Sequence, residues 1–317
     1  MTVLRNNKRE NDSLSPRILA PDPSSLTPNA PQSALDLAGD KGHTAAMLSR
    51  HGLQLRKSMG QNFLVDPNIS EKMVRLSGID ETCGVLEIGP GAGALTRELG
   101  RVAKKVITVE LDNRLIPILN DTFSKSSNIQ IIQGDVLKLD IESLISEKMK
   151  DLRCHVCANL PYNITTPAIS TVIDAGVFET ITVMVQKEVA ERICSAPGSP
   201  EYGAFTVYAN YHAESEILFS VSPECFMPRP KVHSAVIKMS LREKRLLSKE
   251  NEKKFFSVVR AAFGQRRKTL VNALHAAFGS SMEKQQITEK VKICGFDTKV
   301  RGEVLSLADF IVLSAML

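Results

Sequence analysis

The chain has 317 residues, of which 43% are hydrophobic, and a formal net charge of +5. This length suits one large domain with a smaller one, or two medium domains, and no run of about 18 apolar residues indicates a membrane helix. The first residues mix acids with bases and lack an apolar stretch, so neither a secretory signal nor a good transit peptide is indicated. We expect a cytoplasmic protein with no membrane association.

The first 45 residues are predicted to form a disordered tail. Five of the fifteen prolines lie within the first 31 positions, with Ser, Asn and Asp between them. Five basic and five acidic residues balance each other there. Such a segment has too little apolar surface to order itself.

From residue 66 onwards, the pattern alternates between helix and strand. Asp66 and Pro67 are start signals for an amphipathic helix that Gly78 ends. This alternation predicts an open, largely parallel α/β sheet. Strands are expected at 84–89, 105–111, 128–135, 154–160 and 181–186, and helices at 66–79, 94–103, 112–123 and 166–177. Two further strands, 213–222 and 233–241, have no helix-length segment between them, which favours an antiparallel hairpin at a sheet edge.

The remainder of the chain is predicted to be helical. Apolar residues recur at helical spacing in 252–263 and 268–278, and a third helix is expected at 305–317. We therefore expect a catalytic domain at 46–243 and a small helical domain at 244–317. From residue 242 onwards, 15 Lys and Arg face 8 Asp and Glu, a net charge of +7 on a body of −2. This indicates an anionic partner, although solvated helix faces give the same pattern.

The six cysteines do not predict a metal site. Cys154 and Cys157 are spaced like half of a zinc or redox site, but no second pair follows. Alternation along a strand also places the two on opposite faces of the sheet. We expect reduced thiols and no bound metal.

A glycine-rich turn, "LEIGPGAGALT", follows the first long strand and opens a helix. Gly89, Gly91 and Gly93 would let the backbone approach a ligand next to free N–H groups. The spacing fits a nicotinamide dinucleotide as well as S-adenosylmethionine. Glu110, 21 residues after Gly89, could accept hydrogen bonds from the ribose hydroxyls of either cofactor. Asp135 is placed for an adenine amino group, although it also suits a loop cap.

The tetrapeptide "NLPY" ends the fourth strand, where a dinucleotide site would need a second phosphate-binding turn. The carboxamide of Asn159 and the carbonyl of Leu160 can accept hydrogen bonds from an adenine amine, which turns its lone pair toward a methyl donor. Pro161 stiffens the turn, and Tyr162 offers a flat face to an unstacked base. An isolated NLPY also suits an Asx-turn before a helix. Together with the cofactor motifs, it predicts methylation of a flipped-out adenine.

By these motifs, the chain resembles the small-subunit ribosomal RNA adenine N6,N6-dimethyltransferases of the kasugamycin-sensitivity type, from about Leu48 to Leu317. The segment "KSMGQNFLVDPNI" resembles the part that folds over the cofactor, which implies contacts from Gln61, Asn62 and Leu64. "NLPYNI" implies that Asn159 contacts both cofactor and target. The segment "PECFMPRPKVHSAVIKM" resembles the family's F-x-P-x-P-K-V-x-S-A-V block. That match implies Phe226 as a second stacking face, although a Phe beside prolines also suits loop packing.

This resemblance implies a Rossmann-like, class I S-adenosylmethionine-dependent methyltransferase sheet with a small C-terminal helical domain. It further implies four methyl transfers to two adjacent adenosines near the 3′ end of 16S rRNA. The implied partner is the small ribosomal subunit or its precursor, and we expect a monomer. Two departures from the family are the long N-terminal tail and His233, where Asp is usual. Phosphate contacts are expected from Arg229, Lys231, Arg260, Arg266, Arg267 and Lys268, some of which would instead form surface salt bridges.

Three alternatives stay open at this point. An erythromycin-resistance methyltransferase of large-subunit RNA shares the cofactor motifs, but the "PRPKVHSAV" block and NLPY favour the small-subunit enzyme. A ribosome-assembly factor with secondary catalysis would keep the same fold. A nicotinamide dehydrogenase would explain only the glycine turn and Glu110.

Overall fold

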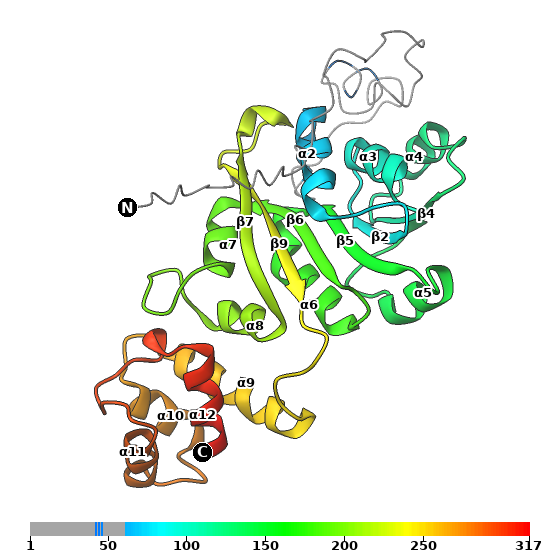
Figure 1. The fold of residues 1–317 in the computed structure, drawn as a ribbon. Coiled ribbons are helices and arrows are strands. Elements are labelled where there is room, and N and C mark those ends of the chain that lie inside the picture. Colours follow the sequence, from blue (N-terminus) through cyan, green and yellow to red (C-terminus); the bar gives the residue numbers. More distant parts are fainter. Residues whose placement is uncertain (1–41, 43, 45, 47–60) are drawn as a thin grey trace, which may run out of the picture.

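The computed structural model describes residues 42, 44, 46 and 61–317 (Figure 1). The segment expected to be a disordered tail therefore lies outside the described residues, apart from Gly42 and Thr44. Within the described part, no helix is both long and apolar enough to cross a membrane.

A mixed seven-stranded sheet forms the centre of the described part, in the order β4-β3-β2-β5-β6-β9-β7. The first five strands in this order are parallel, and β9 runs antiparallel to both of its neighbours. The predicted parallel strands and the edge hairpin are confirmed. The strands are β2 (Cys83–Ile88), β3 (Lys105–Glu110), β4 (Ile129–Gln133), β5 (Arg153–Asn159), β6 (Thr180–Gln186), β7 (Ala213–Val221) and β9 (Ser234–Leu241).

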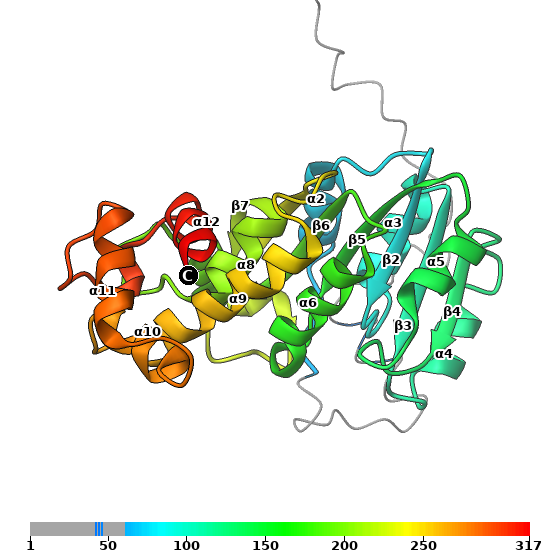
Figure 2. The ribbon, with the colours of Figure 1, turned by 90° about the horizontal axis from the view of Figure 1, so that it is seen from below.

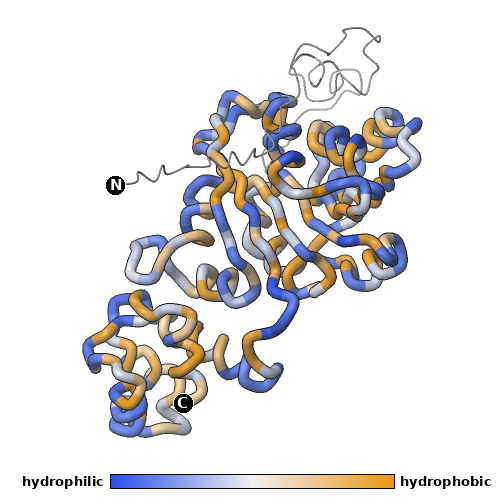
Figure 3. The backbone as a smooth tube through the Cα atoms, in the orientation of Figure 1, coloured by the Kyte–Doolittle hydropathy of each residue, from blue (hydrophilic) through white to orange (hydrophobic). Residues whose placement is uncertain are grey.

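Helices cover both faces of the sheet (Figure 2). Alternate strand residues point to opposite sides, so Leu86 packs into one layer and Val85 into the other. One layer holds α2 (Pro67–Ser77) and α3 (Ala94–Val102). The opposite layer holds α5 (Ile141–Lys148), α6 (Thr165–Ala175), α7 (Lys187–Ile193) and α8 (Ala204–His212), while α4 (Ile116–Thr122) packs in a smaller cluster with Phe63. Hydrophobic stretches, orange in Figure 3, occur along both the strands and the helices.

Two sequence-based expectations are confirmed in detail. The Asp66 side chain accepts a hydrogen bond from the Asn68 backbone N–H at the start of α2, and Gly78 ends that helix with φ +83°. Cys154 and Cys157 lie in the hydrophobic cores on opposite faces of the sheet, and both are free thiols. Among the described residues, no group of three His, Cys, Asp or Glu side chains could hold a metal ion.

The C-terminal helices gather beside the sheet and share a core of their own (Figure 1). They are α9 (Lys249–Gly264), α10 (Leu270–Phe278), α11 (Lys284–Ile293) and α12 (Leu307–Met316). Val207 and Tyr211 of α8 also belong to this core. The hydrophilic stretch between β9 and α9 (Figure 3) contains the proposed domain boundary at residues 243 and 244.

A short ribbon joins two segments that are far apart in the sequence. β1 (Phe63–Leu64) pairs antiparallel with β8 (Phe226–Met227), and the Val65 N–H donates to the Cys225 carbonyl at 2.8 Å. The sequence patterns did not predict this pairing. It fixes the chain just before α2 against the loop that precedes β9.

Candidate active site

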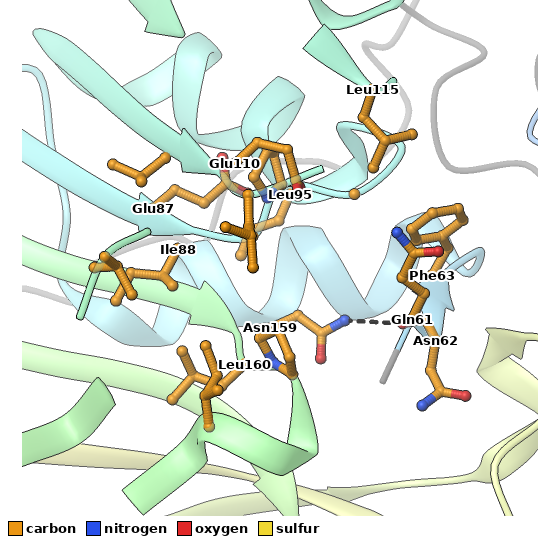
Figure 4. A pocket seen from close by; sticks show the side chains of 18 of the residues that line it. Gln61, Asn62, Phe63, Glu87, Ile88, Leu95, Glu110, Leu115, Asn159 and Leu160 are labelled. Carbon is orange, nitrogen blue, oxygen red and sulfur yellow. Dashed lines mark hydrogen bonds between the residues drawn. The ribbon is translucent and has the colours of Figure 1, made fainter. Parts of the chain in front are cut away.

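A cavity of about 260 Å³ lies where the parallel strands β2, β3, β4 and β5 end (Figure 4). Open α/β sheets bind ligands at this edge. The lining combines five sets of residues predicted for the site (the 61–64 segment, the glycine turn, Glu110, Asp135 and the NLPY turn) with further side chains around them. It comprises residues 61–64, 87–92, 94–95, 109–111, 115, 134–137 and 159–164.

The glycine turn brings backbone close to the cavity at two of its three glycines. Gly89 and Gly91 line the cavity with φ of +67° and +56°. A Cβ at Gly91 would lie 2.7 Å from the ring of Phe63, so only glycine lets that ring close over the turn. Gly93 does not line the cavity; it caps α3 with φ +84°, and a Cβ there would meet the Phe123 ring at 2.8 Å. The structure thus shows Gly93 shaping the turn, and its expected cofactor contact stays a prediction.

Glu110 ends β3 as a nearly buried carboxylate, 7% exposed, on the cavity wall. It accepts a hydrogen bond from the Asp112 backbone N–H at 2.8 Å, and burial raises its pKa. Sequence inspection missed Asp112, which holds the neighbouring segment in place. Its carboxylate accepts from Gln61 Nε2 at 2.9 Å and pairs with Arg114, and the Arg114 hydrogen bond is the main cause that lowers the Asp112 pKa to about 2.

Asp135 lies on the cavity wall but also makes local contacts. Its Oδ1 accepts from the Leu137 N–H at 3.1 Å, and its Oδ2 lies 3.6 Å from the Lys138 Nζ. The sequence left open whether Asp135 caps a loop or faces the cofactor. The structure shows Asp135 capping the loop and lining the cavity at the same time. Leu111 and Leu137, 57% and 37% exposed, also line the cavity. Exposed apolar side chains at a cavity suit a flat heteroaromatic ligand.

Glu87 is a lining residue that the sequence interpretation passed over. It is 1% exposed within β2, and Thr96 Oγ1 donates to its Oε2 at 2.6 Å. Burial raises its pKa to about 7. An acid inside an otherwise apolar strand, two residues before the glycine turn, was the signal that could have found it.

The NLPY turn holds Asn159 and Tyr162 at the same cavity. Asn159 ends β5, and its Nδ2 donates to the Asn62 backbone carbonyl at 3.3 Å (Figure 4). With the amide nitrogen engaged, its Oδ1 is left to accept from a ligand. Tyr162 begins a 3-10 helix, Tyr162–Ile164, directly after Pro161. The tyrosine hydroxyl lies 2.8 Å from the Oγ of Ser234, and Ser234 is the first residue of β9.

Phe226 does not lie where the resemblance implied. Its ring is 1% exposed and packs in the core beneath α2 and α3, and the residue is absent from the cavity wall within the described chain. A ring enclosed on both faces offers no stacking surface to a base. The expectation that Phe226 stacks on the target is corrected: pairing of β8 with β1 turns the side chain into the core.

The expected phosphate contacts fall in two segments. Arg229 and Lys231 precede β9, with Arg229 paired to Glu224, and the others lie at the end of α9 and just after it. Arg266 is exposed but bonded to the protein surface: its Nη2 donates to the carbonyls of Pro200 and Tyr202 and lies 3.5 Å from a Glu303 oxygen. Arg260 Nη2 donates to Ser257 Oγ. Arg267 and Lys268 are exposed.

The chain is similar to known proteins over most of its length. Residues 52–311 match the family described as ribosomal RNA adenine dimethylase. The chain is 46% identical to the ribosomal RNA small subunit methyltransferase A of Shouchella clausii, over 86% of this chain and 92% of that protein. It is 45% identical to the protein of the same name from Geobacillus thermodenitrificans, over 86% and 94%.

Two solved structures resemble the fold. A dimethyladenosine transferase from Plasmodium falciparum superposes with a TM-score of 0.68 and 25% identity, over 78% of this chain and 94% of that one. The 23S rRNA methyltransferase ErmE gives 0.63 and 24%, over 81% and 99%. The second likeness is informative about the fold alone.

Proposed function

The chain belongs to the ribosomal RNA adenine dimethylase family, and on this premise we propose that it transfers methyl groups from S-adenosylmethionine to N6 of two adjacent adenosines in the 3′-terminal hairpin of small-subunit rRNA. The product is N6,N6-dimethyladenosine. One observation carries the proposal: Asn159 and Tyr162 share a cavity with Glu110 and the glycine turn. Similarity to several small-subunit methyltransferases favours this target over large-subunit RNA.

The cavity residues fit S-adenosylmethionine. Glu110 presents a buried carboxylate suited to the two ribose hydroxyls, and Asp135 lies on the same wall for the adenine amine. Gln61, Asn62 and Leu64 belong to a segment that lines the cavity. The hydrogen bond from Gln61 to Asp112 and the pairing of β1 with β8 hold this segment in place. When bound, this cosubstrate supplies an electrophilic methyl group on a positively charged sulfur.

The NLPY turn would prepare the adenine for attack. Asn159 Oδ1 and the Leu160 carbonyl would accept hydrogen bonds from the two N–H groups of the amine. These two hydrogen bonds would move the nitrogen lone pair out of conjugation with the ring. Pro161 fixes the turn, and Tyr162 stacks on the unpaired base, a contact worth about 1–3 kcal/mol. Alignment of the amine nitrogen with the methyl group would supply much of the rate enhancement.

The substrate would be the small ribosomal subunit or its precursor, with the reaction coupled to subunit biogenesis. We propose that a monomeric, cytoplasmic enzyme binds it through the helical domain at 244–317 and the loop before β9. Arg229, Lys231, Arg260, Arg267 and Lys268 are the proposed phosphate contacts. Arg266 would contribute charge in addition to making the hydrogen bonds described above.

A labelling experiment tests the proposal. The purified protein is given labelled S-adenosylmethionine with either unmethylated small subunits or protein-free large-subunit RNA, and mass spectrometry locates any N6,N6-dimethyladenosine. Two adjacent dimethyladenosines near the small-subunit 3′ end are expected. A single modified adenine in large-subunit RNA would instead identify a resistance methyltransferase, and binding of the cofactor without incorporation would favour an assembly factor.

A further inference from the structure

The hydroxyl of Tyr162 is tied to a strand 72 residues further along the chain. Its oxygen lies 2.8 Å from Ser234 Oγ, within hydrogen-bond distance. Tyr162 lines the cavity and is half-buried. The proposed stacking face therefore belongs to a side chain whose far end is anchored outside the NLPY turn.

Ser234 is a rigid anchor. The residue is 0% exposed and begins β9 between two strands, opposite Gln186 of β6 and Val221 of β7. The Lys187 N–H donates to the carbonyl of the preceding residue, His233, at 3.0 Å. A hydroxyl held by strands on both sides moves little, so the phenol it binds is held as well.

We propose that Ser234 is a positioning residue for methyl transfer: its hydroxyl fixes the tilt of the Tyr162 ring, and so the plane on which the target base rests. This inference builds on the proposed role of Tyr162 as the stacking face. Without the bond, the ring could rotate about its side-chain torsions while the turn stayed in place. A small misplacement of the base relative to the methyl group costs about a hundredfold in rate.

Three variants test the inference: Ser234→Ala, Tyr162→Phe and the double variant. Tyr162→Phe keeps the stacking ring and removes the same hydrogen bond from its other end. Tyr208→Phe is the matched control, because the Tyr208 hydroxyl also has a side-chain partner, Asp174 at 2.8 Å, but lies on α8 away from the cavity wall. Turnover is measured on whichever RNA the wild type methylates, with cofactor affinity by calorimetry and apparent Tm beside it.

We expect kcat to fall at least tenfold in each single variant, with cofactor Kd within twofold of the wild type. The double variant should be no slower than the slower single variant, because both changes remove one bond. Tyr208→Phe should keep the wild-type kcat. Wild-type kcat in Ser234→Ala would overturn the inference, as would losses that multiply in the double variant. If Ser234→Ala does not fold, Tyr162→Phe decides alone, and wild-type kcat in that variant overturns it.

A second readout needs no methylation. An unpaired RNA carrying 2-aminopurine loses fluorescence when that base stacks on an aromatic ring. We expect the wild type and Tyr208→Phe to quench it and Ser234→Ala to quench it less; equal quenching would overturn the inference. If the wild type quenches the fluorescence but methylates neither ribosomal RNA, the proposed function is wrong. The part of the inference that survives is that Ser234 orients the Tyr162 ring toward a stacked base.

Discussion

Asn159 Nδ2 donates a hydrogen bond of 3.3 Å to the backbone carbonyl of Asn62, which links the end of β5 to the segment 61–64 that lines the cavity. The contact uses the amide nitrogen and leaves the amide oxygen as the acceptor for the target amine. The residue that would activate the base is thus oriented by the segment proposed to cover the cofactor.

Asn159→Ala should remove that acceptor without disturbing the ribose end of the cavity. We expect turnover to fall by at least about a hundredfold, comparable with loss of one preorganised hydrogen-bonding group in other active sites, while cofactor Kd stays within a factor of about ten. Single-turnover assays and calorimetry measure the two quantities. Asn120→Ala, on the exposed side of α4, is the control. Normal turnover in Asn159→Ala would remove this residue from the mechanism.

Glu110→Gln should weaken cofactor binding. A buried carboxylate can accept from both ribose hydroxyls, and hydrogen bonds to charged groups contribute about 1.5–3 kcal/mol each, so Kd should rise at least tenfold. Calorimetry with S-adenosylmethionine measures it, with the exposed Glu289→Gln as the control. An unchanged Kd would show that the cofactor ribose lies elsewhere.

Glu87→Gln should stabilise the protein in a pH-dependent way. The Glu87 pKa is about 7 in the folded protein against 4.5 for the ordinary group, with burial as the main cause. Between pH 4.5 and pH 7 the Glu87 carboxyl is ionised in the unfolded chain but largely protonated in the folded protein, so the wild type loses stability as the pH rises through this range. The Gln side chain of the variant does not titrate and loses none. The advantage of the variant should be smallest below pH 4.5 and reach on the order of 3 kcal/mol above pH 7.

Denaturant unfolding of the cofactor-free protein at several pH values measures this gap. Glu289→Gln, an exposed carboxylate on α11, should give a gap near zero at each pH. A gap for Glu87→Gln that stays constant from pH 4.5 to 8 would contradict the prediction.

Arg266 and Arg267 are sequence neighbours with different expected roles. Arg266→Ala removes hydrogen bonds to the carbonyls of Pro200 and Tyr202, and should lower stability by about 1–2 kcal/mol given its partial exposure. Arg267→Ala should leave stability unchanged and reduce the slope of log K against log salt for RNA binding by about 1. Melting curves and filter binding at several salt concentrations separate the two effects. A salt slope that Arg267→Ala and Lys268→Ala both leave unchanged would move the RNA interface elsewhere.

The inner strands of the main sheet were predictable because they are mainly apolar runs between turn signals. Within residues 61–317, four α-helices were not predicted. α5 and α7 span only two turns, α8 has apolar residues all round, and α11 is mostly polar. β1 and β8 are two residues each. Their pairing depends on the fold rather than on any local pattern.

The candidate site was predictable where backbone geometry dictates the residue type. Gly89, Gly91 and the NLPY turn lie at strand ends, and their positions follow from the strand pattern. Phe226 shows where this reasoning fails, since a motif fixes a residue's place in the chain but not the direction of its side chain. The contact between Tyr162 and Ser234 left no trace in the sequence either, because two hydroxyl residues 72 positions apart carry no spacing signal.

β9 begins at Ser234, beside the proposed base platform, and ends at Leu241, where the linker to α9 leaves the sheet. Eight strand residues span about 25 Å, and pairing along both edges prevents this strand from stretching. If the proposed function holds, β9 sets a fixed distance between the base-binding end of the cavity and the linker to the helical domain. An RNA bound to the helical domain could then place in the cavity only a nucleotide that lies at this distance from the bound part. The enzyme would therefore select its adenosines by the three-dimensional shape of the folded RNA rather than by the flanking nucleotide sequence.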